Sequence, residues 1–158
     1  MARVEDCIAA LSTVDPAKVE HAIRGLASIG ESCLEQLFHR LEAEGDSTSR
    51  VNILRAIGRV AYENSYFDPN LLKRLQDFAS SKGIGEGGEQ RALYERASYV
   101  KVIGMLGEPN CLKELKEELN HPDHRVRANA IEGMAFILKR WDCTPGIDIQ
   151  GDLEQAVK

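Results

Sequence analysis

Apolar residues recur at spacings of three and four along almost the whole chain. In residues 19–29 the stripe consists of Val19, Ala22, Ile23, Leu26 and Ile29. This spacing places the side chains on one face of an α-helix, and no stretch shows the strict alternation typical of a half-buried strand. Asp15-Pro16 is typical of a helix start, and His121-Pro122-Asp123 indicates the end of one helix and the cap of the next. The pattern predicts an all-α fold.

The helical pattern occurs in four copies. They start at Ala22, Ile53, Tyr99 and Ala130, at intervals of 31, 46 and 31 residues. A second apolar stripe follows each of the first three copies. These stripes are Leu34-Leu37-Leu41, Leu72-Leu75-Ala79 and Leu112-Leu115-Leu119. Helix pairs repeated at a fixed period predict a stack of similar units.

We expect one domain over residues 1–158, with units at 15–44, 46–80, 89–120 and 121–158. The longer second interval is explained by a glycine-rich loop insertion at 80–88, where a helix would be costly. A further helix is expected near Arg3–Leu11, and a short final helix near Asp152–Val157. Both ends are atypical, as is common for the terminal units of a repeat stack.

The segment Leu119–Met134 resembles the first helix of a HEAT repeat. It contains Asp123, then Val126-Arg127, then small residues and Ala130. The resemblance covers roughly residues 15–140. It implies a HEAT-like fold of the type also found in phycobilin lyases, a short right-handed α-α superhelix (solenoid) of about four helix pairs with atypical end caps.

The resemblance also implies a hydrogen-bonded ladder of aspartates and arginines between adjacent repeats. By position, the ladder would use Asp15, Asp46, Arg50, Arg96, Asp123 and Arg127. Val19 replaces the arginine of the first copy and Ala92 replaces the aspartate of the third. The ladder is therefore expected to be broken at both places.

HEAT proteins are usually scaffolds or adaptors, so the resemblance implies a non-catalytic protein–protein interaction module that binds on its concave, second-helix face. A helical wheel places a set of residues away from the apolar stripes of the second helices. They are Gln36, His39, Arg40, Arg74, Asp77, Glu114, Glu117 and Glu118. The set changes from weakly basic to acidic along the chain, which predicts a partner with a basic patch. The alternative that mixed charges only keep the helices soluble stays open.

Relatives of the HEAT family suggest two other functions. Phycobilin lyases are HEAT-like, which leaves open an accessory enzyme or chaperone that handles a bilin-like ligand. Divergent DNA alkylation-repair glycosylases suggest nucleic-acid binding. That affinity depends on phosphate neutralisation by Lys and Arg. The balance of 20 Lys and Arg against 25 Asp and Glu, a net charge of -5, disfavours it.

The composition predicts a cytoplasmic protein. A chain of 158 residues can bury a core without disulfides or a structural metal. Its apolar runs are short and interrupted by charge, so no membrane span or secretory signal fits. The cysteines Cys7, Cys33, Cys111 and Cys143 are far apart. This spacing favours buried thiols in a reducing compartment.

Possible chemical motifs have simpler explanations. Residues 83–88 match G-x-G-x-x-G, but a helix precedes them and Glu86 would repel phosphate, so a flexible loop is favoured over a nucleotide site. His121 and His124 lack a second ligand pair, so a solvent-facing turn is favoured over a metal site. We expect no enzyme activity, no cofactor and no metal.

Overall fold

The computed structural model describes residues 3–84 and 89–141. Within these ranges all the regular secondary structure is helical, which confirms the predicted all-α class. The α-helices are α1 (Val4–Ala10), α2 (Pro16–Ile29), α3 (Leu34–Ala43), α4 (Ser47–Glu63), α5 (Pro69–Lys82), α6 (Gln90–Leu106), α7 (Cys111–Glu118) and α8 (His124–Trp141). A short 3-10 helix, Glu31–Cys33, joins α2 to α3. No helix in this part of the chain is long and apolar enough to cross a membrane.

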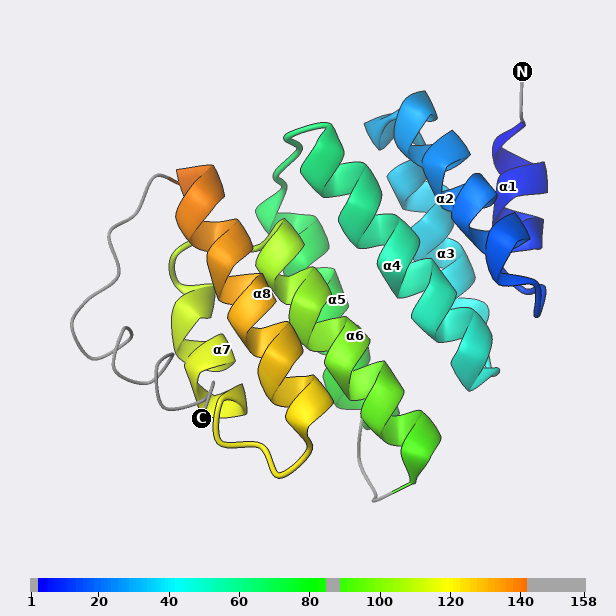
Figure 1. Cartoon of the computed structure of the whole chain (residues 1–158). Helices are drawn as coiled ribbons and strands as arrows, with labels where there is room; N and C mark the ends of the chain where they lie inside the picture. Colours follow the sequence, from blue (N-terminus) through cyan, green and yellow to red (C-terminus); the bar gives the residue numbers. More distant parts are fainter. Residues whose placement is uncertain (1–2, 85–88, 142–158) are drawn as a thin grey trace.

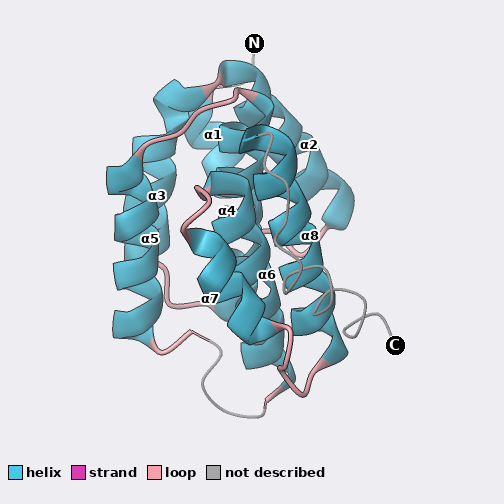
Figure 2. Cartoon of the chain, turned by 90° about the vertical axis from the view of Figure 1, so that its left-hand side faces the viewer, coloured by secondary structure: helices cyan, strands magenta, loops and turns pink. Residues whose placement is uncertain are grey.

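The helices form two layers. Helices α2, α4, α6 and α8 lie side by side, and each packs against the next (Figure 1). Helices α3, α5 and α7 lie behind them, and in Figure 2 α3 and α5 occupy one side of the molecule while α8 occupies the other. The first helices of the expected units thus make one layer and the second helices make the other. Helix α1 packs on α2 at one end.

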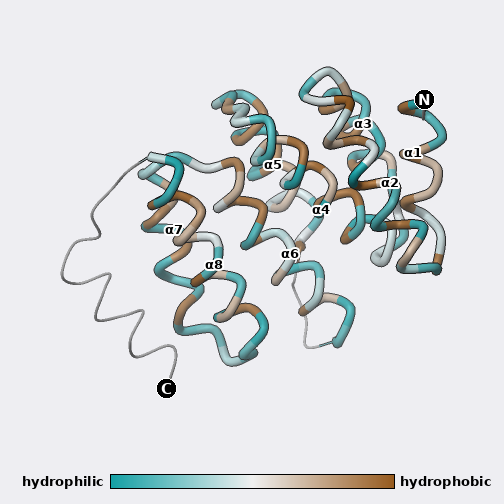
Figure 3. Tube along the Cα trace, turned by 45° about the horizontal axis from the view of Figure 1, so that its top comes forward, coloured by the Kyte–Doolittle hydropathy of each residue, from teal (hydrophilic) through white to brown (hydrophobic). Residues whose placement is uncertain are grey.

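The apolar stripes meet between the layers. Buried side chains form a continuous core from Cys7 in α1 to Ile137 in α8. Leu37 of α3, Leu75 of α5 and Leu115 of α7 come from the second-helix stripes and are fully buried. Hydrophobic and hydrophilic stretches recur along the helices in Figure 3, as expected when one face of each helix is apolar. Each charged outer face is therefore held in place by the buried stripe opposite to it.

The helix ends correct one sequence prediction. Helix α5 continues through Ser80, Ser81 and Lys82, so these residues are not part of a loop. They include no glycine, and the helix ends only at Gly83, whose φ of 59° lies in the left-handed region that glycine adopts easily. Ile84 then folds back into the core. Residues 85–88 of the predicted loop and the predicted helix near 152–157 lie outside the described residues.

Candidate functional site

The eight residues predicted to face a partner border three hollows on the α3–α5–α7 layer. Gln36, His39 and Arg40 line a hollow between α1 and α3 of about 500 Å³. Arg74 and Asp77 line one of about 430 Å³ beside α5. Glu114, Glu117 and Glu118 line the largest of the three, about 630 Å³, together with Arg96, Tyr99 and His121. We call this last one the acidic hollow.

Glu114 joins three helices at the acidic hollow. Its Oε1 accepts a hydrogen bond of 2.9 Å from the Tyr99 hydroxyl on α6, and its Oε2 accepts one of 2.9 Å from Gln76 on α5. Burial, followed by the charge of Glu114, raises the pKa of Tyr99 far above its ordinary value. Tyr99 therefore stays protonated and remains a donor to the carboxylate at physiological pH.

Glu118 is buried, so the helical-wheel prediction that it faces a partner is wrong for this residue. Its side chain forms an ion pair with Arg96 of α6, and the Arg96 guanidinium lies 5.6 Å from the centre of the Tyr99 ring. Glu118 lies at the edge of the α7 stripe, where the cation on α6 draws its carboxylate inward. Glu117 is exposed, as the wheel predicts, and Glu114 is half-buried. Glu117 is therefore the carboxylate of α7 that is best placed to meet a partner.

In the other half of the layer, the predicted charged residues form ion pairs within α3 and α5, between these two helices, and with Glu44 directly after α3. Arg74 forms ion pairs with Glu35, at 2.7 Å, and with Glu42. Arg40 pairs with Glu44 at 2.9 Å. His39 lies 3.3 Å from Glu35, and Asp77 pairs with Lys73 at 2.6 Å. These glutamates were not part of the predicted set, so the weakly basic character expected for this half is offset, and the acidic hollow remains the charged part.

The side chains of the six predicted ladder residues bond to other groups instead of to one another. The three aspartates sit at helix starts: Asp15 accepts from the amide of Ala17, Asp46 from Ser49 and Asp123 from Arg125. The three arginines bond to other groups: Arg50 to Glu95, Arg96 to Glu118 and Arg127 to the carbonyls of His121 and Pro122. The aspartates thus act as helix caps, since a carboxylate at the N-cap satisfies an amide that lacks an intrahelical partner. Of these arginines, Arg50 of α4 bonds to the neighbouring helix of its own layer, through Glu95 of α6.

The thiols are buried and poorly suited to nucleophilic chemistry. Cys7, Cys33 and Cys111 are free and buried, while Cys143 lies outside the described residues. Burial raises the pKa of all three, and that of Cys33 to about 11. Because the thiolate is the reactive form, these cysteines react slowly at neutral pH.

His121, one of the two histidines considered as metal ligands, takes part in local structure. Nδ1 of His121 accepts a 3.0 Å hydrogen bond from the amide of Asp123, which closes the turn before α8. Among residues 3–84 and 89–141, no group of three or more His, Cys, Asp and Glu side chains could hold a metal ion. The carboxylates of Glu114 and Glu117 give the acidic hollow groups that can bond to a cation.

A second charged hollow, which the sequence analysis missed, lies on the opposite layer. We call it the basic hollow, and its charged lining residues are Glu20, Arg55, Arg59 and Lys101. Arg55 and Arg59 are four apart, a spacing that places both on one helix face. This spacing was the only feature of the sequence that pointed to a basic surface here. The rest of the lining comes from α2, α6 and α8, which only the tertiary structure brings together.

Comparisons of the chain with family models, with curated proteins and with solved structures found no match.

Proposed function

We propose that this protein is a non-catalytic scaffold or adaptor, a HEAT-like α-solenoid that binds another protein on its second-helix side. Two features support the solenoid. The helices alternate between two layers in chain order, and each first helix packs on the next first helix. A stack of this kind creates an extended surface suited to recognition of a protein partner.

The acidic hollow carries the proposal. Three carboxylates, Glu114, Glu117 and Glu118, border it, and Arg96 neutralises Glu118. Glu117 is exposed, and each oxygen of Glu114 has a second lone pair in addition to the one used by Tyr99 or Gln76. The hollow is thus suited to a lysine or arginine side chain from a partner. The proposed partner presents a basic segment, and the buried free thiols support a cytoplasmic setting.

The test is binding by a variant with an altered hollow. Glu114→Gln/Glu117→Lys changes the charge and leaves the buried Glu118 intact. The amide at position 114 keeps an oxygen for Tyr99 and offers an NH2 group, from which Gln76 can accept after turning its own amide. The wild-type chain and the variant serve as baits in a native lysate, and the affinity of the retained partner is then measured by calorimetry. We expect the variant to bind at least about tenfold more weakly, a loss of about 1.4 kcal/mol. The difference should shrink at high salt, because exposed charges are screened.

The control is Glu31→Lys/Glu89→Gln, which makes the same charge changes at two exposed glutamates elsewhere. It should bind like wild type. Equal binding by the hollow variant and wild type, or equal losses in both variants, would contradict the proposed surface. A coloured small molecule that co-purifies with wild type, in the absence of a protein partner, would instead favour the bilin-handling alternative.

A further inference from the structure

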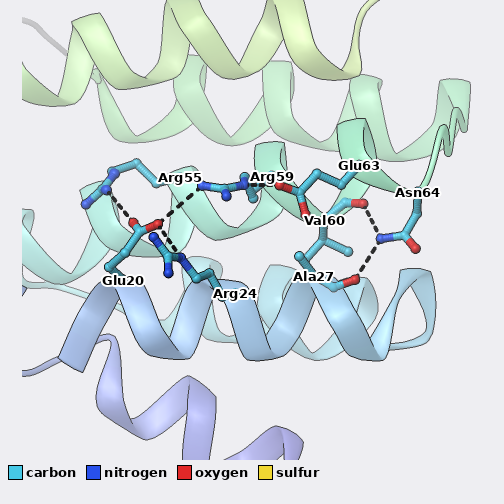
Figure 4. A network of polar contacts seen from close by, with 8 residues as sticks. All are labelled: Glu20, Arg24, Ala27, Arg55, Arg59, Val60, Glu63 and Asn64. Carbon is cyan, nitrogen blue, oxygen red and sulfur yellow. Dashed lines mark hydrogen bonds and ion pairs between the residues drawn. The ribbon is translucent and has the colours of Figure 1, made fainter. Parts of the chain in front are cut away.

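One carboxylate is shared by three arginines on the first-helix layer. Glu20 of α2 lies 3.2 Å from Arg24 Nε, 3.4 Å from Arg59 and 3.5 Å from Arg55 (Figure 4). Arg59 also forms an ion pair with Glu63, four residues further along α4. A single carboxylate balances one of these cations, and Glu63 balances a second. The cluster therefore keeps a positive charge in a protein whose net charge is -5.

The guanidinium groups have hydrogen-bonding capacity left over. Each guanidinium carries five N–H donors. The ion pair of Arg55 with Glu20, at 3.5 Å, is longer than an ordinary N–H···O hydrogen bond of 2.7–3.2 Å. Arg55 is also exposed. Its donors are thus available to a better-placed acceptor from outside the chain.

Two of these arginines, Arg55 and Arg59, border the basic hollow, which spans α2, α4, α6 and α8. Its volume is about 250 Å³, and three cations, Arg55, Arg59 and Lys101, face one carboxylate, Glu20, in its lining. Ser98 and Asn129 add polar groups. The apolar part of the lining comes from Ile23, Val102 and Met105. The hollow therefore combines a cationic rim with a small apolar floor.

We propose that the basic hollow is a second binding surface and that it takes an acidic segment of a partner protein. Carboxylates of that segment bond to Arg55, Arg59 and Lys101 in competition with Glu20, and a neighbouring apolar side chain covers Met105. Charged hydrogen bonds between guanidinium and carboxylate groups are among the strongest that proteins form. The surface is distinct from the acidic hollow, so the chain can join a basic partner to an acidic one.

The charges around the hollow favour a peptide over a polyanion. Nucleic acid and anionic membranes need several cations without nearby carboxylates, because their affinity comes from many phosphate contacts. Here Glu20, Glu63 and Glu132 lie among the cations, and Glu132 pairs with Lys101 at 3.0 Å. A short acidic segment can place its carboxylates between them.

The experiment measures the fluorescence anisotropy of a labelled glutamate-rich peptide with interspersed leucines, titrated with the full chain. A peptide with lysine in place of glutamate is the matched probe. We expect Arg55→Ala/Lys101→Ala to weaken binding of the acidic peptide by at least about tenfold. Arg40→Ala/Lys73→Ala, which removes the same charge from α3 and α5, should leave it within about twofold of wild type. Glu114→Gln/Glu117→Lys should not weaken it, so failure here is distinguishable from failure of the acidic hollow.

Glu20→Gln separates a binding role from a purely structural one. It removes the competing carboxylate, so the acidic peptide should bind at least about threefold more tightly. An ion-pair network that only stabilises the fold gives no such gain. The proposal is overturned if the acidic peptide does not bind, if Glu20→Gln does not tighten binding, or if the control variant loses as much affinity as Arg55→Ala/Lys101→Ala. Tighter binding of a single-stranded oligonucleotide or an anionic vesicle, equally sensitive to Arg55→Ala/Lys101→Ala, would also overturn it.

Discussion

Gly104 of α6 and Gly133 of α8 meet where the two helices cross. A Cβ atom placed on Gly104 would lie 2.1 Å from the Cα atom of Gly133 and 2.3 Å from its carbonyl oxygen. The obstacle is backbone, which cannot move aside as a flexible side chain can. The close approach of α6 and α8 therefore depends on the missing side chain at Gly104, and it places α8 against the helix that carries Arg96 and Tyr99.

Gly104→Ala should destabilise the protein by at least about 3 kcal/mol, even though alanine favours a helix by about 1 kcal/mol over glycine. The helices must separate to admit the methyl group, and buried contacts along α6 and α8 are lost. Urea unfolding followed by far-UV circular dichroism measures the change in the free energy of unfolding.

Two other glycines provide the comparison. A Cβ atom on Gly133 would lie 3.1 Å from the Val100 carbonyl oxygen, so Gly133→Ala should cost less than Gly104→Ala. A Cβ atom on Gly45 would meet no other described atom within 4 Å, so Gly45→Ala should change the unfolding free energy by less than about 0.5 kcal/mol. Similar stabilities for Gly104→Ala and Gly45→Ala would contradict the close helix crossing.

The ion pair between Arg50 and Glu95 joins α4 to α6. Two Arg50 nitrogens lie 2.9 and 2.7 Å from Glu95 Oε1, and only 5% of Glu95 is exposed. Glu95→Ala leaves a mostly buried guanidinium without its carboxylate and should cost about 2–4 kcal/mol. The double variant Arg50→Met/Glu95→Leu removes both charges and should recover most of that loss. A double variant as unstable as Glu95→Ala would show that packing, not the lone charge, causes the loss. Chemical unfolding of the three chains measures these differences.

Local patterns predicted the helices, because the apolar stripes and the aspartate caps are properties of neighbouring residues. The same patterns failed for contacts between helices. Glu118 lies at the edge of the apolar stripe on a helical wheel, and its ion pair with Arg96, 22 residues earlier, accompanies its burial. The basic hollow was missed for the same reason, since Glu20, Arg55 and Lys101 come from three different helices. Which charges share a surface depends on how the helices stack, and no single segment encodes that.

The buried cysteines should be nearly inert in the folded chain. With a pKa of about 11, Cys33 is a thiolate in only about one molecule in a thousand at pH 8. In a Cys143→Ser background, we expect Cys7, Cys33 and Cys111 to react with a disulfide reagent slowly in buffer and rapidly in denaturant. The absorbance of the released thiolate measures both rates. Fast reaction of all three in buffer would contradict their burial.

Acid should weaken the start of α8 through Asp123. The side chain of Asp123 accepts hydrogen bonds from Arg125, which hold its pKa well below the ordinary value of 3.8. A lowered carboxyl pKa gives a stabilisation that is fully present above the ordinary pKa and is lost as the pH falls through the lowered one. Asp123→Asn keeps a capping side chain but removes the charge, so it should be less stable than wild type near neutral pH.

The difference between wild type and Asp123→Asn should begin to shrink as the pH falls below 3.8, because the unfolded wild-type chain then binds a proton at Asp123 that the folded chain does not. Urea unfolding at about pH 6 and about pH 3 measures it. Arg125→Gln is the reciprocal variant. It removes the main cause of the low pKa, so its own stability should depend less on pH in this acid range than that of wild type. A constant difference between wild type and Asp123→Asn at both pH values would mean that Asp123 stabilises α8 by hydrogen-bond geometry alone, without a contribution from its charge.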